Sequence, residues 1–188
     1  MKSKKGIYLV LILFALVAMS ACTKKAVPPP PGYGPETGSG QMGAPGEGEG
    51  GLGNAARWGR LGIHSEAQKR EFLDRAAAFQ NQDVYFDYDA YTLSDPARKI
   101  LDEKIAFLKR YPAVSVTIQG NCDERGTEEY NLALGQRRAD AAKQYIMNTG
   151  GGNFEISTVS FGKERPVATG HNEAAWAKNR RDHFVLKY

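Results

Sequence analysis

The sequence contains few of the residues on which most catalytic and metal sites depend. Its 188 residues include two cysteines and three histidines, too few for a disulfide-rich scaffold or a multi-cysteine zinc module. The histidines, His64, His171 and His183, are scattered and form no His-Glu-x-x-His pattern. The chain also has no Gly-x-Ser-x-Gly elbow and no phosphate-binding loop. We therefore expect no metal, no cofactor and no enzymatic activity.

The chain has almost no net charge when residues 1–21 are left out. The formal net charge is +4, from 25 Lys and Arg against 21 Asp and Glu. The first 21 residues contain three lysines and no acid, so removing three from 25 leaves 22 basic against 21 acidic side chains. Such a chain lacks the basic face that a nucleic-acid-binding protein needs. We expect no nucleic-acid partner.

A short apolar run stands at the amino terminus. Residues 6–19 are largely apolar, follow a basic start and precede two small residues. Because a membrane span needs about 20 residues, the pattern favours a signal peptide over residues 1–21, with a retained anchor as the alternative. The residues before Cys22 resemble the lipobox of bacterial lipoproteins, although Met19 replaces the usual Leu. The resemblance implies a lipidated Cys22 held in outer-membrane lipid by three acyl chains, with the protein facing the periplasm.

Glycine and proline are concentrated in one region. Residues 28–53 contain ten glycines and six prolines, a composition that cannot form a packed core. Four consecutive prolines favour extended polyproline II, and the remainder favours a flexible coil. We predict a linker over residues 22–56, a helical lead-in over residues 57–80 and a folded domain over residues 81–188. A spacer without a role is the alternative that composition leaves open.

Hydrophobic periodicity in the second part of the chain predicts alternating strands and helices. Residues 65–80, 94–111 and 127–147 have helical spacing, and Ser94 and Thr127 are suitable N-caps. The expected strands are residues 84–86, 114–118, 156–161 and 183–187, and a short helix is expected over residues 173–178. This order predicts an α+β or α/β fold, an α/β sandwich in which crossover helices pack on one sheet.

One segment combines groups that suit a charged ligand. Residues 120–127 run from a strand end to a helix start, where free N–H groups favour an anion. Asp123 supplies a carboxylate there that suits an ammonium. On the following helix, the residues expected to be buried are Leu132, Gly135, Ala139, Ala142 and Ile146. Arg138 lies about 80° from the centre of that face, at the border of the core.

A partly desolvated guanidinium can hold a carboxylate through two hydrogen bonds. Asp123 and Arg138 together therefore predict a receptor for a zwitterion, such as an amino-acid head group. A surface ion pair worth about 0–1 kcal/mol is the alternative that spacing leaves open.

Three stretches resemble the OmpA-like peptidoglycan-binding domain family. They are residues 84–91 (VYFDYDAY), 120–131 (GNCDERGTEEYN) and 134–140 (LGQRRAD). Three further stretches narrow the resemblance to the lipoproteins of the Tol–Pal system, namely residues 159–166, 170–176 and 179–181. The resemblance covers about residues 80–188. It implies a βαβαββ mixed sheet with helices on one face and non-covalent binding of the meso-diaminopimelate of peptidoglycan.

The resemblance also implies roles for individual residues. By matching position, Asp123 would bind the ammonium of diaminopimelate and Arg138 its carboxylate. Loop backbone around Tyr88 and Asp89 would complete the carboxylate site, with Tyr88 as a wall. The remaining groove-lining residues would be Asn121, Arg125, Thr127 and Leu134. Residues 179–181 would be structural rather than in contact with the ligand.

The function implied is a non-enzymatic tether between outer membrane and cell wall, active in envelope integrity and cell division. TolB would be a periplasmic partner. One alternative is another OmpA-like envelope lipoprotein that binds the wall but not TolB. The other is a peptidoglycan hydrolase that uses Cys122 or an Asp–Glu pair. A small, mostly buried thiol is the simpler interpretation of Cys122.

Overall fold

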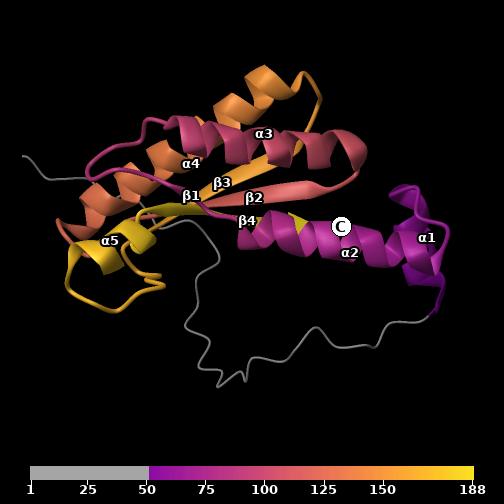
Figure 1. Cartoon of the computed structure of the whole chain (residues 1–188), viewed down its shortest axis with the longest axis horizontal. Coiled ribbons are helices and arrows are strands. Elements are labelled where there is room, and N and C mark those ends of the chain that lie inside the picture. Colours follow the sequence, from indigo (N-terminus) through magenta and orange to yellow (C-terminus); the bar gives the residue numbers. More distant parts are fainter. Residues whose placement is uncertain (1–50) are drawn as a thin grey trace, which may run out of the picture. The chain divides into compact units, whose positions relative to one another are not determined.

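The computed structural model describes residues 51–188, in which helices and strands alternate (Figure 1). The elements are α1 (Gly51–Arg60), α2 (Glu66–Asn81), β1 (Val84–Tyr85), α3 (Asp95–Arg110), β2 (Ser115–Asn121), α4 (Glu128–Gly150), β3 (Glu155–Gly162), α5 (Glu173–Asn179) and β4 (Arg181–Lys187). The predicted signal peptide, Cys22 and most of the predicted linker lie outside the described residues. Within residues 51–188, no helix is both long and apolar enough to cross a membrane.

The four strands form a mixed sheet in the order β1-β4-β2-β3. β4 pairs antiparallel with both β1 and β2, whereas β2 and β3 run parallel. A parallel pair needs a crossover connection, which α4 provides. Along β2, the buried Val116 and Ile118 alternate with the half-exposed Thr117 and Gln119. The helices therefore cover one face of the sheet, as predicted.

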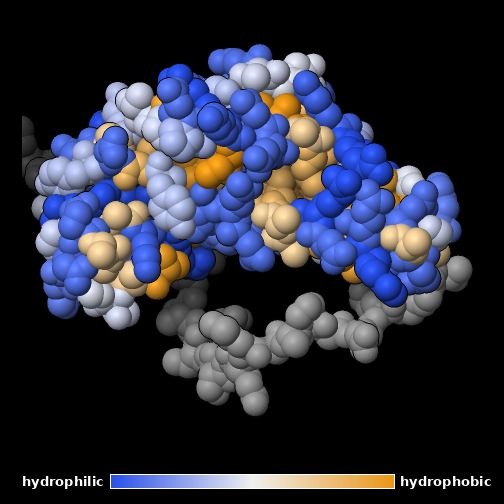
Figure 2. Space-filling model, in the orientation of Figure 1, coloured by the Kyte–Doolittle hydropathy of each residue, from blue (hydrophilic) through white to orange (hydrophobic). Residues whose placement is uncertain are grey.

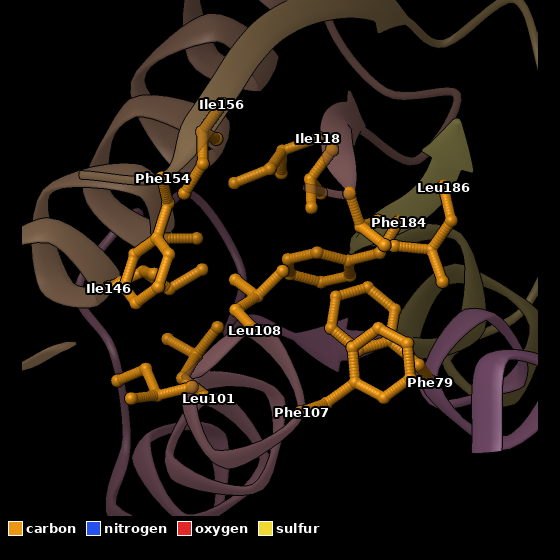
Figure 3. Packing of buried hydrophobic residues seen from close by; sticks show 14 of the residues in the cluster. Phe79, Leu101, Phe107, Leu108, Ile118, Ile146, Phe154, Ile156, Phe184 and Leu186 are labelled. Atoms are coloured by element: carbon orange, nitrogen blue, oxygen red, sulfur yellow. The ribbon is translucent and has the colours of Figure 1, made fainter. Parts of the chain in front are cut away.

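The core lies between that face and the helices (Figure 3). Leu101 and Leu108 of α3, Ile146 of α4 and Phe184 of β4 are fully buried, and burying a side chain of this size contributes roughly 1.5–3 kcal/mol. Most of the surface visible in Figure 2 is hydrophilic, since the apolar helix faces are turned inward.

The helix that was expected to lead into the domain is part of its core. Phe72 of α2 packs edge to face on Tyr111 and Tyr188, with ring centroids 4.9 and 4.8 Å apart. Phe79 packs on Phe184, with a centroid distance of 6.0 Å. The predicted boundary at residue 81 thus divides residues that fold together.

The helix α1 replaces the last part of the predicted linker. The linker was expected to reach residue 56, whereas α1 begins at Gly51. Trp58 packs on Phe72 and Tyr188, with ring centroids 5.8 and 6.2 Å apart. These tertiary contacts stabilise a glycine-containing helix whose own propensity is low.

Two assignments on α4 were wrong. Leu132, expected in the core, is 38% exposed, and Arg138, expected at the border of the core, is fully buried. The buried residues of the helix are Asn131, Leu134, Gly135, Arg138, Ala139, Ala142, Ile146 and Gly150. The inward face of α4 therefore includes a charged side chain.

Helix α4 approaches the sheet closely at two glycines. A Cβ added to Gly120 would lie 1.9 Å from the carbonyl oxygen of Gly135. A Cβ added to Gly135 would lie 2.3 Å from Oγ of Ser160. This contact holds the end of β2 against α4, close in sequence to Asp123 and Arg138, which both line the pocket described below.

We expect Gly120→Ala to lower the free energy of unfolding by about 2–3 kcal/mol, because the new methyl group meets rigid backbone. Urea denaturation followed by circular dichroism measures the change. Gly59→Ala is the matched control, since a Cβ there has no neighbour within 4 Å. Equal unfolding midpoints in the two variants would contradict the close contact.

Candidate ligand-binding site

A pocket of about 170 Å³ lies where β2 ends and α4 begins. Its lining residues are Tyr88, Asp89, Cys122, Asp123, Arg125, Gly126, Tyr130, Asn131, Leu134, Arg138 and Arg180. The pocket therefore brings together most of the residues expected to bind a ligand. The exceptions are Asn121 and Thr127.

Asn121 and Thr127 shape the loop from outside the pocket. Strand β2 continues to Asn121, beyond its predicted end at residue 118. Asn121 is consequently buried within the sheet, where its amide donates to the carbonyl of Gln119 at 2.9 Å. The Thr127 hydroxyl accepts from the backbone N–H of Tyr130 at 3.2 Å and so caps α4, as predicted.

Arg138 binds backbone carbonyls from two distant segments. Its Nε donates to Ala90 O at 2.8 Å, Nη1 to Asn121 O at 2.9 Å and Nη2 to Asp87 O at 3.2 Å. Nη1 also donates to Sγ of Cys122 at 3.4 Å. Burial lowers the pKa of Arg138, yet a guanidinium stays protonated. Since neutral acceptors hold it, its positive charge is available to an anion.

Asp182 is a fully buried acid whose protonation state bears on the charge around Arg138. Burial raises the pKa of Asp182 well above its ordinary value, while the positive charge of Arg138 acts in the opposite direction. Neither carboxyl oxygen has a hydrogen-bond partner among the described residues. The neutral form is therefore favoured, and Arg138 keeps its net charge.

Asp123 is buried and accepts hydrogen bonds from two arginines. Its Oδ1 accepts from the backbone N–H and Nε of Arg125, both at 3.1 Å. Its Oδ2 accepts from Nη2 of Arg125 at 2.6 Å and Nη1 of Arg180 at 3.3 Å. Burial acts to raise the pKa of Asp123, but the hydrogen bonds from Arg125 and Arg180 outweigh it, and the pKa is lowered. The carboxylate is ionised at neutral pH.

Arg180 was expected to be structural, yet it lines the pocket. Its Nε donates to Phe86 O at 3.0 Å and its Nη2 to Oε1 of Glu173 at 2.6 Å. Arg180 immediately precedes β4, whose central position in the sheet brings this end of the chain beside the loop after β2. Local sequence patterns give no signal for that long-range pairing.

Two further lining residues, Tyr130 and Asn131, could have been found from helical spacing. They lie about one turn before Leu134, which in turn lies one turn before Arg138, so the four share one face of α4. The hydroxyl of Tyr130 donates to Oδ1 of Asp89 and closes one side of the pocket.

The surroundings of Cys122 do not suit a nucleophile. The side chain is buried, and Sγ donates to Asn131 O at 3.4 Å. Burial raises the pKa of Cys122 to about 11, so the thiol is neutral at pH 7 and the reactive thiolate is scarce. The neighbouring acid, Glu124, accepts from Nε1 of Trp176 and contacts Nδ1 of His171, each at 2.8 Å. This geometry favours a buried structural thiol.

Comparisons with known proteins agree with this geometry. Residues 85–180 match the OmpA family. The peptidoglycan-associated lipoprotein of Pasteurella multocida is 53% identical over 105 residues, which cover 56% of this chain and 69% of that protein. The protein of the same name from Pseudomonas aeruginosa is 41% identical over 144 residues, which cover 77% and 85%.

A solved structure shows the same relationship. The crystal structure of the peptidoglycan-associated lipoprotein from Burkholderia pseudomallei has a TM-score of 0.54 and 48% sequence identity, and it covers 56% of this chain and 90% of that one. The chain therefore belongs to the OmpA family and, within it, to the peptidoglycan-associated lipoproteins.

Proposed function

We propose that this protein binds diaminopimelate-containing peptidoglycan without covalent bonds and ties the outer membrane to the cell wall as part of the Tol–Pal system. The observation that carries the proposal is one pocket containing an ionised carboxylate, Asp123, and a buried guanidinium, Arg138, whose protein partners are neutral. These groups complement the ammonium and carboxylate of an amino-acid head group. The names of the related proteins support peptidoglycan as the polymer that carries this ligand.

Arg138 can give only part of the hydrogen bonds that the ligand carboxylate needs. Four of the five N–H groups of Arg138 already point to Ala90 O, Asn121 O, Cys122 Sγ and Asp87 O. One N–H on Nη2 remains, so the ligand carboxylate would receive a single hydrogen bond from this arginine rather than the two expected from sequence. Backbone groups at Tyr88 and Asp89 would supply the other hydrogen bonds to the ligand carboxylate. Leu134 would contact the methylene chain of the ligand.

Affinity at each site can be modest. A hydrogen bond to a charged group contributes about 1.5–3 kcal/mol, and the pocket offers only a few. Many copies anchored in one membrane and facing one polymer gain from high effective concentration. Lipidation of Cys22 in the outer membrane, a linker that crosses the gap and TolB as a periplasmic partner complete the proposal. The protein acts in it as a tether and not as an enzyme.

The proposal is tested by co-sedimentation with isolated sacculi. We expect the protein to bind diaminopimelate-type walls and not lysine-type walls, because the lysine side chain has the ammonium but lacks the second carboxylate. Asp123→Asn should weaken binding tenfold or more, since it removes the charge that attracts the ammonium.

Asp123→Asn should leave the fold intact. Arg180, the more buried of its two partners, keeps its hydrogen bonds to Phe86 O and Glu173, and circular dichroism checks this. Asp74→Asn, an exposed change of equal charge on α2, should bind like the wild type. Undiminished binding by Asp123→Asn would reject the site. Equal binding to both wall types would show that Arg138 does not recognise the second carboxylate.

A further inference from the structure

The acceptor positions of the Asp123 carboxylate are all in use. A carboxylate offers about four positions for hydrogen bonds, and Asp123 receives four: three from Arg125 and one from Arg180. A ligand ammonium can reach this carboxylate only if one of these donors leaves.

The donor that can leave is the side chain of Arg125. The Arg180 side chain is 6% exposed and is fixed in place by its hydrogen bonds to Phe86 O and Glu173, so it stays beside Asp123. The Arg125 side chain is 30% exposed and lies at the rim of the pocket. Its guanidinium carbon lies 4.0 Å from the ring centroid of Tyr88 and 4.2 Å from that of Trp176.

We infer that Arg125 occupies, in the free protein, the place that the ligand ammonium takes, and that every ligand must displace it, so that a ligand bearing both an ammonium and a carboxylate binds well whereas an amine alone gains too little. The inference rests on the proposed function and adds to it a residue that competes with the ligand for Asp123. An amine alone exchanges one cation for another at Asp123. A zwitterion makes the same exchange and gains the contact with Arg138.

The strength of the internal contact supports this role. Arg125 meets Asp123 through two side-chain hydrogen bonds, at 3.1 and 2.6 Å, the paired geometry that is the strongest between these groups. A single ammonium provides no such pair. The displaced guanidinium would remain near Glu173, whose Oε2 lies 3.9 Å from Nη2 of Arg125.

Arg125→Ala tests the inference in the full chain. Binding is measured by calorimetry with two peptides, L-Ala-D-Glu-meso-diaminopimelate and the same peptide with L-lysine. We expect both to bind more tightly than to the wild type, each by tenfold or more, because both are released from the same competition with Arg125. The ratio of the two affinities, which the contact with Arg138 sets, should stay close to that of the wild type. Arg137→Ala, an exposed change of equal charge next to Arg138, should change neither affinity more than twofold.

A second variant, Arg125→Gln, keeps the inference testable if Arg125→Ala does not fold, and it should show the same direction. Unchanged or weaker binding of both peptides by a folded Arg125 variant would overturn the inference, because the side chain would then be neutral or would contact the ligand itself. Binding that appears only after Arg125 is removed would support the inference and reject wall binding by the unmodified chain. Absence of binding in every variant would reject both.

Discussion

Replacing Arg138 with methionine should lower the free energy of unfolding by about 3–5 kcal/mol and abolish peptidoglycan binding. The guanidinium is fully buried and satisfies the carbonyl groups of Asp87, Ala90 and Asn121. Each buried carbonyl left without a donor costs about 1–3 kcal/mol. Urea denaturation with linear extrapolation measures the loss, which is a large part of the stability of an ordinary domain.

Two matched variants separate charge from hydrogen bonding at this position. Arg138→Lys keeps the positive charge but cannot reach all three carbonyl groups, so we expect a smaller loss of stability. Arg137→Met removes the exposed neighbour and should have little effect. Wild-type stability in Arg138→Met would show that other donors replace the guanidinium. Because binding and stability are expected to fall together here, Asp123→Asn is the clearer test of ligand recognition.

Lys104→Met should stabilise the protein, and the gain should be largest below pH 7. Lys104 is 1% exposed, and its Nζ lies 4.3 and 4.2 Å from the ring centroids of Phe79 and Phe184. Burial lowers the pKa of Lys104 from 10.5 to about 7, although the charges of Asp83 and Glu103 act to raise it. The folded protein thus holds this proton less tightly than the unfolded chain does.

The direction of the pH dependence follows from this difference. Between pH 7 and 10.5 the unfolded chain binds a proton that the folded protein has released, so the stability of the wild type rises with pH across this window. Below pH 7 the folded protein carries the whole penalty, for which roughly 5 kcal/mol is an upper bound.

The methionine also loses the hydrogen bond that Lys104 donates to Phe79 O, so we expect a net gain of about 2–3 kcal/mol at pH 6 and little at pH 10. Urea midpoints at pH 6, 8 and 10 measure it. Lys99→Met, an exposed lysine on the same helix, is the control and should show no pH-dependent difference from the wild type. A less stable Lys104→Met at pH 6 would mean that the hydrogen bond and ring contacts outweigh the penalty of burial.

Those parts of the fold that depend on residues close together in the sequence could be predicted. Ser94 and Thr127 cap α3 and α4 as expected, because an N-cap acts within three residues of itself. The position of β4 between β1 and β2 could not be predicted, since it pairs residues such as Val84 and Asp182 that are far apart in the chain.

The site could be predicted in part for the same reason. Asp123 belongs to a loop that a local pattern identifies. The depth of Arg138 depends on carbonyl groups from two other segments, which compensate for its burial and which no periodicity reveals. Without that compensation, a charge on the inward face of a helix is unfavourable. The sequence pattern therefore predicts that Leu132 is buried and that Arg138 is not, whereas the structure shows the reverse. Arg180 reaches the pocket only through the pairing of β4.

The central position of β4 has a mechanical consequence for a tether. Tyr188, just beyond the end of β4, packs on Phe72 of α2, whereas Arg180, just before its start, lines the pocket. The strand thus connects the side on which the chain enters the domain with the side that would hold the wall (Figure 1). A pull between the two would run along β4 and shear its ladder with β2, from Lys187–Ser115 to Asp182–Gly120. Hydrogen bonds that are sheared together share the force. The pocket should therefore release its ligand before the sheet opens, and the bond between the protein and the wall can form again once the tension falls.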